Sequence, residues 1–108
     1  MSTAANSRPR HERPQATRYR AEQLRRLRNE IPIDRLIKQL HWPSKRRDGR
    51  FVFLCPLCGE FLTTVKHETN LGRCFNCKRN FNPIDFTIQV RHYDFVEAVE
   101  FLLPLLPR

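Results

Sequence analysis

Four cysteines in two Cys-x-x-Cys pairs are the residues of this chain whose types and spacing predict chemistry. Cys55 and Cys58 form the first pair, and Cys74 and Cys77 form the second, with 15 residues between the pairs. This spacing is typical of zinc sites. Two such turns joined by a hairpin supply four thiolates at about 2.3 Å from the ion and leave no open coordination position. The sequence therefore predicts one structural Zn²⁺ and no catalytic residue.

Other uses of these side chains are less well supported. An iron–sulfur cluster also takes four thiolates, but the spacing favours zinc. A thioredoxin-like redox pair needs a βαβ pattern, which we do not find here, and it would leave one cysteine pair unused. His67 lies in a polar turn and His41 stands beside Trp42. Because four thiolates complete the coordination shell, we expect both histidines to be surface or packing residues.

The length of the chain makes a metal useful for folding. A chain of 108 residues allows one small domain and a tail, and such a domain buries little apolar surface. Zinc binding contributes on the order of 10–16 kcal/mol in small zinc peptides. We find no secretory signal and no run of about 18–20 apolar residues that could span a membrane. We therefore expect a cytoplasmic protein, whose cysteines bind metal rather than form disulfides.

The positive charge lies almost entirely in the first half of the chain. The net charge is +9, and residues 1–50 carry 14 basic and 5 acidic side chains, whereas residues 51–108 carry 6 of each. This asymmetry indicates a polyanionic partner, most often nucleic acid. A solvated tail without a partner is the alternative. A membrane surface is less favoured, because Leu24 and Leu27 are too few to make a broad apolar face.

The chain divides into a basic arm over residues 1–30 and a zinc-binding domain over residues 31–108. We expect residues 1–16 to be disordered, because they hold almost nothing to bury. Residues 18–30 are good helix formers that Thr17 would cap. The apolar stripe of this segment is narrow, so we expect the helix to form only against a partner or nucleic acid.

The sequence of this domain predicts an α+β fold, a zinc ribbon-like antiparallel sheet with flanking helices. Apolar residues from Ile33 to Leu40 follow helical spacing after Pro32. Lys45–Arg50 reads as a basic turn with an Asp-Gly signal. Residues 51–54, 61–65 and 71–75 favour strands, with a polar turn at residues 67–70.

Two further helices are predicted after the second cysteine pair. Asn82 is a cap and Pro83 a first-turn residue for a helix over residues 83–91, although alternating apolar residues there also permit a strand. Asp94 and Glu97 fit an acidic capping box. The helix that follows would turn Phe95, Val99 and Leu102 to the core and end at Pro104.

Basic and aromatic residues gather near the predicted hairpin. Single-stranded nucleic acid binds to such surfaces, through a basic groove and aromatic platforms. Among the phenylalanines we expect Phe53, Phe61 and Phe75 to favour the core and Phe81, between two asparagines, to be the most exposed. The segment from Arg18 to Arg28 would add phosphate contacts that ignore sequence. The candidate DNA contacts are Arg46, Arg47, Arg50, Lys66, Arg73, Lys78, Arg79 and Phe81.

The order of these motifs resembles one known family. Cys-Pro-Leu-Cys at 55–58, Cys-Phe-Asn-Cys at 74–77, Ile-Asp-Phe at 84–86 and Phe-Val-Glu-Ala-Val-Glu at 95–100 are similar to the N-terminal zinc-binding domain of bacterial replicative (DnaG-type) primases. The resemblance runs from about Ile31 to about Leu103. Two features depart from the family: Cys58 replaces its usual histidine ligand, and residues 78–82 replace a glycine-rich segment.

The resemblance implies a module that contacts single-stranded template DNA and helps to choose where primer synthesis starts. It does not imply catalysis, because the chain lacks the large catalytic domain of the family and offers no acidic cluster for two-metal phosphoryl transfer. The chain would be encoded by a bacterium, a phage or a mobile element. Two alternatives stay open: an adaptor that docks on a replication or recombination partner, such as a polymerase or helicase, and a zinc subunit that serves a primase in trans. An exposed apolar segment over residues 101–106 would favour docking, although we expect that segment to join the core.

Overall fold

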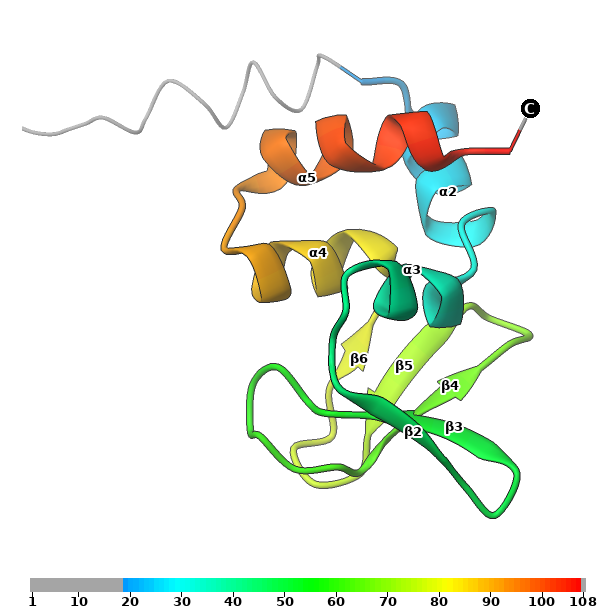
Figure 1. Cartoon of the computed structure of the whole chain (residues 1–108). Coiled ribbons are helices and arrows are strands. Elements are labelled where there is room, and N and C mark those ends of the chain that lie inside the picture. Colours follow the sequence, from blue (N-terminus) through cyan, green and yellow to red (C-terminus); the bar gives the residue numbers. More distant parts are fainter. Residues whose placement is uncertain (1–18, 108) are drawn as a thin grey trace, which may run out of the picture.

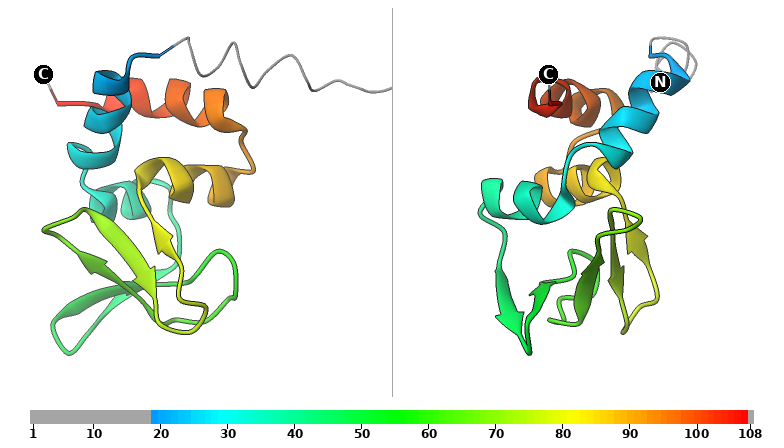
Figure 2. Two further views of the ribbon diagram at one scale, coloured as in Figure 1. Left: turned by 180° about the vertical axis from the view of Figure 1, so that it is seen from behind. Right: turned by 90° about the vertical axis from the view of Figure 1, so that its right-hand side faces the viewer.

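The computed structural model describes residues 19–107, which form a five-stranded antiparallel sheet covered on one side by helices (Figure 1). The strands follow one another in the order β2-β3-β4-β5-β6. Helices α3 and α4 lie next to the sheet, and α5 lies farther from it, as both views of Figure 2 also show. The expected α+β zinc ribbon fold is confirmed. The predictions for residues 1–16 and for Thr17 lie outside the described residues.

Helix α2 (Ala21–Asn29) packs against its own domain and needs no partner to cover it. Its Leu27 is fully buried, and Tyr19 is buried in the same hydrophobic cluster. The Tyr19 hydroxyl donates to the carboxylate of Glu100 on α5. We expected the packed domain to begin near Ile31, but its core already includes Tyr19. The narrow apolar stripe of α2 meets α4 and α5 of the same domain.

Helix α3 (Ile33–Gln39) begins after Pro32, as the sequence predicts, and buries Ile33, Leu36 and Ile37. The side chain of Asn70, in the turn between β4 and β5, joins this region to the sheet. Its Oδ1 accepts from the Ile33 backbone N–H at 2.9 Å. Its Nδ2 donates to the carbonyl oxygens of Arg28 and Ile31 at 2.8 and 2.7 Å. One side chain therefore fixes the segment between α2 and α3 onto the sheet.

The first two strands differ from the predicted turn at Lys45–Arg50. Residues 44–47 pair with residues 50–53, and only Asp48 and Gly49 remain as the turn. Both have positive φ, +52° and +78°, which is the backbone of the two-residue hairpin turns that suit twisted strands. The short last strand was not predicted. The strands are β2 (Ser44–Arg47), β3 (Arg50–Phe53), β4 (Thr63–Lys66), β5 (Leu71–Cys74) and β6 (Asn80–Phe81).

Helices α4 (Pro83–Arg91) and α5 (Phe95–Leu102) begin at the predicted caps. The Asn82 side chain accepts from the Asp85 backbone N–H at 2.8 Å. Asp94 does the same for Glu97 at 2.8 Å. Residues 83–91 are therefore helical, and the strand alternative is wrong. A short 3-10 turn, η2 (Leu103–Leu105), ends the helical layer.

The core lies between the sheet and the helices. Phe53 of β3 meets Phe86 of α4 edge to face, with ring centroids 5.5 Å apart. Ala98, Val99 and Leu102 of α5 are fully buried. The apolar residues beyond Leu102 are half-buried against the same cluster, which is the core role that we expected for this segment.

Candidate metal centre and nucleic-acid surface

The first cysteine pair forms a tight knuckle between β3 and β4. The backbone N–H groups of Leu57 and Cys58 both point at Cys55 Sγ, at 3.4 Å. The chain then turns back, because Gly59 N–H donates to the Cys55 carbonyl at 3.0 Å and Cys55 N–H donates to the Glu60 carbonyl at 3.0 Å. Gly59 has φ +77°, where glycine carries no steric cost.

The second pair, after β5, repeats this backbone pattern. Cys77 N–H points at Cys74 Sγ at 3.4 Å. Lys78 N–H donates to the Cys74 carbonyl, and Cys74 N–H donates to the Arg79 carbonyl, both at 2.9 Å. Lys78 takes the place of Gly59, with φ +62°. The two knuckles are thus equivalent in hydrogen bonding but not in residue type.

The four sulfur atoms come together in a cluster that fits one zinc ion. All four lie within 4.8 Å of one another. Sγ of Cys55 is 3.7 Å from Sγ of Cys77, and Sγ of Cys58 is 3.6 Å from Sγ of Cys74. A zinc–sulfur bond of about 2.3 Å gives a tetrahedron with edges of about 3.8 Å. The sulfur positions therefore match a closed, structural Zn²⁺ site.

The surroundings of the sulfurs also suit a cation. Burial raises the pKa of Cys55 and, together with the neighbouring thiols, raises the pKa of Cys77 to about 12. Burial acts in the same direction on Cys74, but backbone N–H groups outweigh it and hold the pKa of Cys74 at about 6. Four thiols packed this closely resist joint ionisation, so a divalent cation is what stabilises four thiolates.

Thr63 is the residue next to the sulfurs that the sequence did not single out. It faces Cys74 across the β4–β5 pair and is fully buried. Its hydroxyl oxygen forms no hydrogen bond of standard geometry within residues 19–107. The Cys74 sulfur is the acceptor in its reach, and interaction with the Thr63 hydroxyl helps to lower the pKa of that thiol. Such outer partners commonly support metal ligands. His67 and His41 are exposed and lie outside the sulfur cluster, as expected.

Comparison with known proteins places this centre in a family. A family model described as the CHC2 zinc finger, a zinc ribbon of the DnaG type, matches residues 19–106. The chain belongs to the CHC2 zinc-finger family. Its cofactor is one structural Zn²⁺, and its fold is that of a primase-type zinc domain. The match begins at residue 19, and Tyr19 is part of the hydrophobic core.

Curated relatives agree with the family. The chain is 28% identical over 87 residues to a DNA primase of Streptomyces coelicolor, which covers 79% of this chain and 14% of that protein. It is 33% identical over 58 residues to DNA primases of Staphylococcus epidermidis and Staphylococcus aureus, which covers 52% of this chain and 10% of those proteins. The CHC2 chain therefore spans about a seventh or less of the length of these relatives.

The sheet of the CHC2 domain sorts the candidate DNA contacts by strand alternation. Phe53 packs on Phe86 of α4, so residues of its phase face the helices and residues of the other phase face outward. Val52 belongs to the outward phase and lines a hollow there, although it is buried. The register aligns Thr64 with Arg73, Arg47 with Arg50, and Lys66 with Leu71. We call the outward-facing side of the sheet the outer face. It carries Lys45, Arg47, Arg50, Val52, Thr64, Lys66, Leu71, Arg73 and Asn80.

Three of the remaining candidates lie away from the outer face. Arg46 is exposed but pairs with the buried Phe51, so it has the opposite phase. Lys78 and Arg79 are exposed on the second knuckle. Arg79 also lines a small hollow beside α4 with Asp85. The structure thus brings four of the seven basic candidates onto one surface and sets three around its margins.

The aromatic expectation is wrong for Phe81. Only 3% of this residue is exposed, because β6 turns it toward the core opposite Gly72, and a buried ring offers no platform for a base. Phe75 is the exposed ring, at 53%. It follows Cys74, whose side chain points inward to the metal, so alternation along the strand turns Phe75 outward. That signal was present in the sequence, since ligand cysteines must face one another.

A second ring lies beside the basic residues of the outer face. The Lys45 ammonium lies 4.7 Å from the centre of the Phe61 ring, within cation–π range. Phe61 lines the same surface hollow as Phe75, Arg47 and Arg50. Lys45 and Phe61 are not among the DNA contacts that the sequence predicted.

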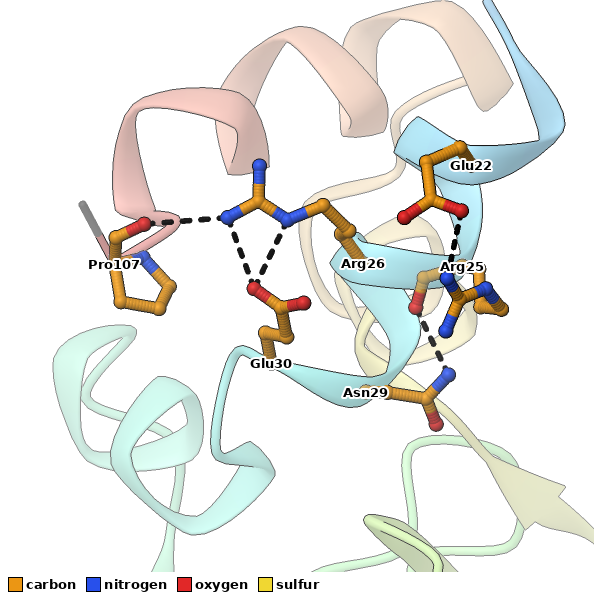
Figure 3. A network of polar contacts seen from close by, with 6 residues as sticks. All are labelled: Glu22, Arg25, Arg26, Asn29, Glu30 and Pro107. Carbon is orange, nitrogen blue, oxygen red and sulfur yellow. Dashed lines mark hydrogen bonds and ion pairs between the residues drawn. The ribbon is translucent and has the colours of Figure 1, made fainter.

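Two arginines of helix α2 form ion pairs with glutamates (Figure 3). Arg25 pairs with Glu22 at 2.6 Å and Arg26 pairs with Glu30 at 2.9 Å. Arg26 also donates to the Pro107 carbonyl at 3.3 Å, which ties α2 to the end of the described chain. No ion pair within residues 19–107 involves Arg20 or Arg28, so these two arginines carry the free charge of the helix.

Within residues 19–107, none of the helices has the length and apolar character needed to cross a membrane.

Proposed function

We propose that this CHC2 domain is a DNA-binding module of primase type that contacts single-stranded template DNA through its outer face. The observation that carries the proposal is the meeting of basic and aromatic side chains there. Arg47 and Arg50 line one hollow together with the rings of Phe61 and Phe75. Single-strand binding uses this combination, since cations neutralise phosphates while bases stack on rings.

Zinc supports this surface from the opposite side of the sheet. Cys74 holds the end of β5 through the metal site, and the next residue is the exposed Phe75. The Phe75 N–H donates to the Leu62 carbonyl at 3.1 Å, which ties the second knuckle to the loop before β4. Loss of zinc would release both segments and with them the binding surface.

The module contributes binding rather than catalysis in this proposal. Within residues 19–107, the four cysteines are the one group of ligand side chains close enough to hold a metal ion. Two-metal nucleotide transfer instead needs carboxylates. A polymerase would carry out primer synthesis, and a helicase is a further candidate partner. A role at template DNA also implies a cytoplasmic location.

The adaptor alternative has less support. Its strongest feature was the apolar segment at residues 101–106, but Leu102 is buried and its apolar neighbours are half-buried in the core cluster. Large exposed apolar residues lie instead near the knuckles, at Leu57, Leu62 and Phe75.

The test is fluorescence anisotropy of the zinc-loaded protein with a labelled single-stranded oligonucleotide, competed with duplex DNA at two salt concentrations. We expect the single strand to bind more tightly than the duplex, and its affinity to fall with salt by a slope of about 0.7 per phosphate contact. Equal binding to both forms would show a purely electrostatic association. No binding would favour a protein partner, and either result would overturn the proposal.

A further inference from the structure

Two hollows adjoin on the outer face, and Arg50, Thr64 and Phe75 line both of them. Their volumes are about 410 and 390 Å³, within the range of about 300–1,000 Å³ that is usual for small-ligand sites. The exposed ring of Phe75 is thus part of the wall that the hollows share. Phe61, Leu62 and Arg47 also line the first hollow, and Lys66, His67 and Glu68 also line the second.

The backbone of Phe75 is held in place before any ligand arrives. Cys74 precedes it as a zinc ligand, and Cys77 binds the same ion two residues beyond it. Its own N–H is bonded to the Leu62 carbonyl. A residue on such a fixed backbone loses little backbone freedom when its ring is covered, which favours affinity. A phenylalanine that is 53% exposed also gains from being covered by further apolar surface.

We propose that Phe75 inserts between two consecutive bases of a single strand, with one base in each hollow. This inference rests on the proposed function and adds a footprint to it. Stacking on both faces of one ring requires adjacent bases, because a gap in the sequence would leave one face bare. Arg47 and Arg50 at the first hollow and Lys66 at the second then lie beside the phosphates that flank the pair. Phe61 would contact one of the two bases only.

The test uses single strands about twelve nucleotides long in which abasic sites replace most bases. One strand keeps a single base, a second keeps two adjacent bases, and a third keeps two bases separated by one abasic site. The remaining bases define the binding position, so sliding cannot blur the result. We expect the adjacent pair to bind roughly fivefold or more tightly than the separated pair, and the separated pair to bind like the single base.

Substitutions assign the effect to the ring. Phe75→Ala should remove the difference between adjacent and separated pairs, and Phe75→Trp should keep it. Phe61→Ala should weaken binding of the adjacent pair while leaving that pair better than the separated one. Leu57→Ala is the matched control, because Leu57 is an exposed apolar knuckle residue, 44% accessible, that lines neither hollow. Zinc content and circular dichroism show that each variant is folded.

The outcomes separate this inference from the proposed function. If the unmodified strand does not bind the wild-type protein, the proposed function itself is wrong. If that strand binds but adjacent and separated pairs bind equally, the module binds DNA and the insertion of Phe75 is wrong. A difference that survives Phe75→Ala in a folded protein would also overturn the inference.

Discussion

Gly72 of β5 lies so close to Phe53 of β3 that no larger residue fits. A Cβ at Gly72 would stand 2.6 Å from Phe53 Cζ and 2.9 Å from Cε1. The ring cannot retreat, because it is fully buried and packs on Phe86. The glycine therefore gives this ring its place at the junction of the sheet with the helices.

Gly72→Ala should destabilise the domain by about 1–3 kcal/mol through overpacking. Chemical denaturation of the zinc-loaded protein measures the change. Phe53→Leu in the same chain makes room for the methyl group, so the double variant should lose less stability than the sum of the two single variants. Strict additivity would mean that the two positions do not compete for space.

Asn70→Ala should cost about 1–3 kcal/mol, because it removes three hydrogen bonds between the β4–β5 turn and the segment after α2. Hydrogen exchange should speed up most at the Ile33 amide, which loses its acceptor. Asn70→Gly is the control for the backbone, since Asn70 has φ +56° and glycine relieves that strain. An unchanged Ile33 exchange rate in both variants would show that the side chain does not hold the turn.

Removal of zinc should unfold the domain. We expect a chelator to abolish the native circular dichroism and the thermal transition, and added zinc to restore them. A chelated protein that kept both would refute the metal-dependent fold.

Acid should release zinc in the same way, because every thiolate must be free of its proton to bind. The pKa of Cys74 is lowered to about 6, so its thiolate contributes stability above the ordinary thiol pKa and loses that contribution as the pH falls through about 6. Cys55 and Cys77, with raised pKa values, oppose a metal-free fold at alkaline pH. Zinc release followed with a colorimetric chelator should increase as the pH is lowered, because protons compete with the ion for all four sulfur atoms, and full retention of zinc at acidic pH would contradict this.

Arg50→Ala should weaken single-strand binding several-fold and reduce the salt slope by about 0.7, the value of one phosphate contact. Arg46→Ala is the matched control. It removes the same charge from the same hairpin but from the opposite phase of the sheet. Equal losses from both variants would indicate a diffuse positive charge and not a surface with a defined side.

Arg28→Ala on α2 should lower the affinity for all DNA sequences equally and flatten the salt dependence. Arg25→Ala should do less, because Glu22 already engages that side chain. The measurement is anisotropy with several unrelated oligonucleotides. A changed sequence preference in the Arg28 variant would show that α2 reads bases, contrary to its expected role as an electrostatic anchor.

Local signals in the sequence predicted much of this fold. Asn82 and Asp94 mark the two helix starts, and the cysteine spacing marks the knuckles, because caps and metal ligands act over a few residues. The strand at Ser44–Arg47 was missed because its residues are polar and exposed, so no apolar alternation revealed it. Leu27 was misjudged for a different reason: its burial depends on α4 and α5, more than fifty residues away in the chain.

The candidate surface was also predictable only where local sequence determines it. The basic residues were recognisable by charge, but their sorting into an outer face and its margins depends on register. Phe81 and Phe75 show this most clearly, because Phe81 was expected to be exposed and is buried, whereas Phe75 was expected in the core and is exposed. Flanking asparagines suggested that Phe81 is exposed, whereas its phase relative to Gly72 buries it.

The two knuckles share one hydrogen-bonding pattern, but Gly59 stands in the first where Lys78 stands in the second. A left-handed backbone costs about 1–2 kcal/mol at a residue with a side chain and almost nothing at glycine. The unfolded chain thus visits the shape of the first knuckle more often than that of the second. We expect Cys55 and Cys58 to coordinate the zinc ion first, and Cys74 and Cys77 to coordinate it afterwards. Assembly of the domain would then have a direction along the chain, with the segment that presents Phe75 completed last.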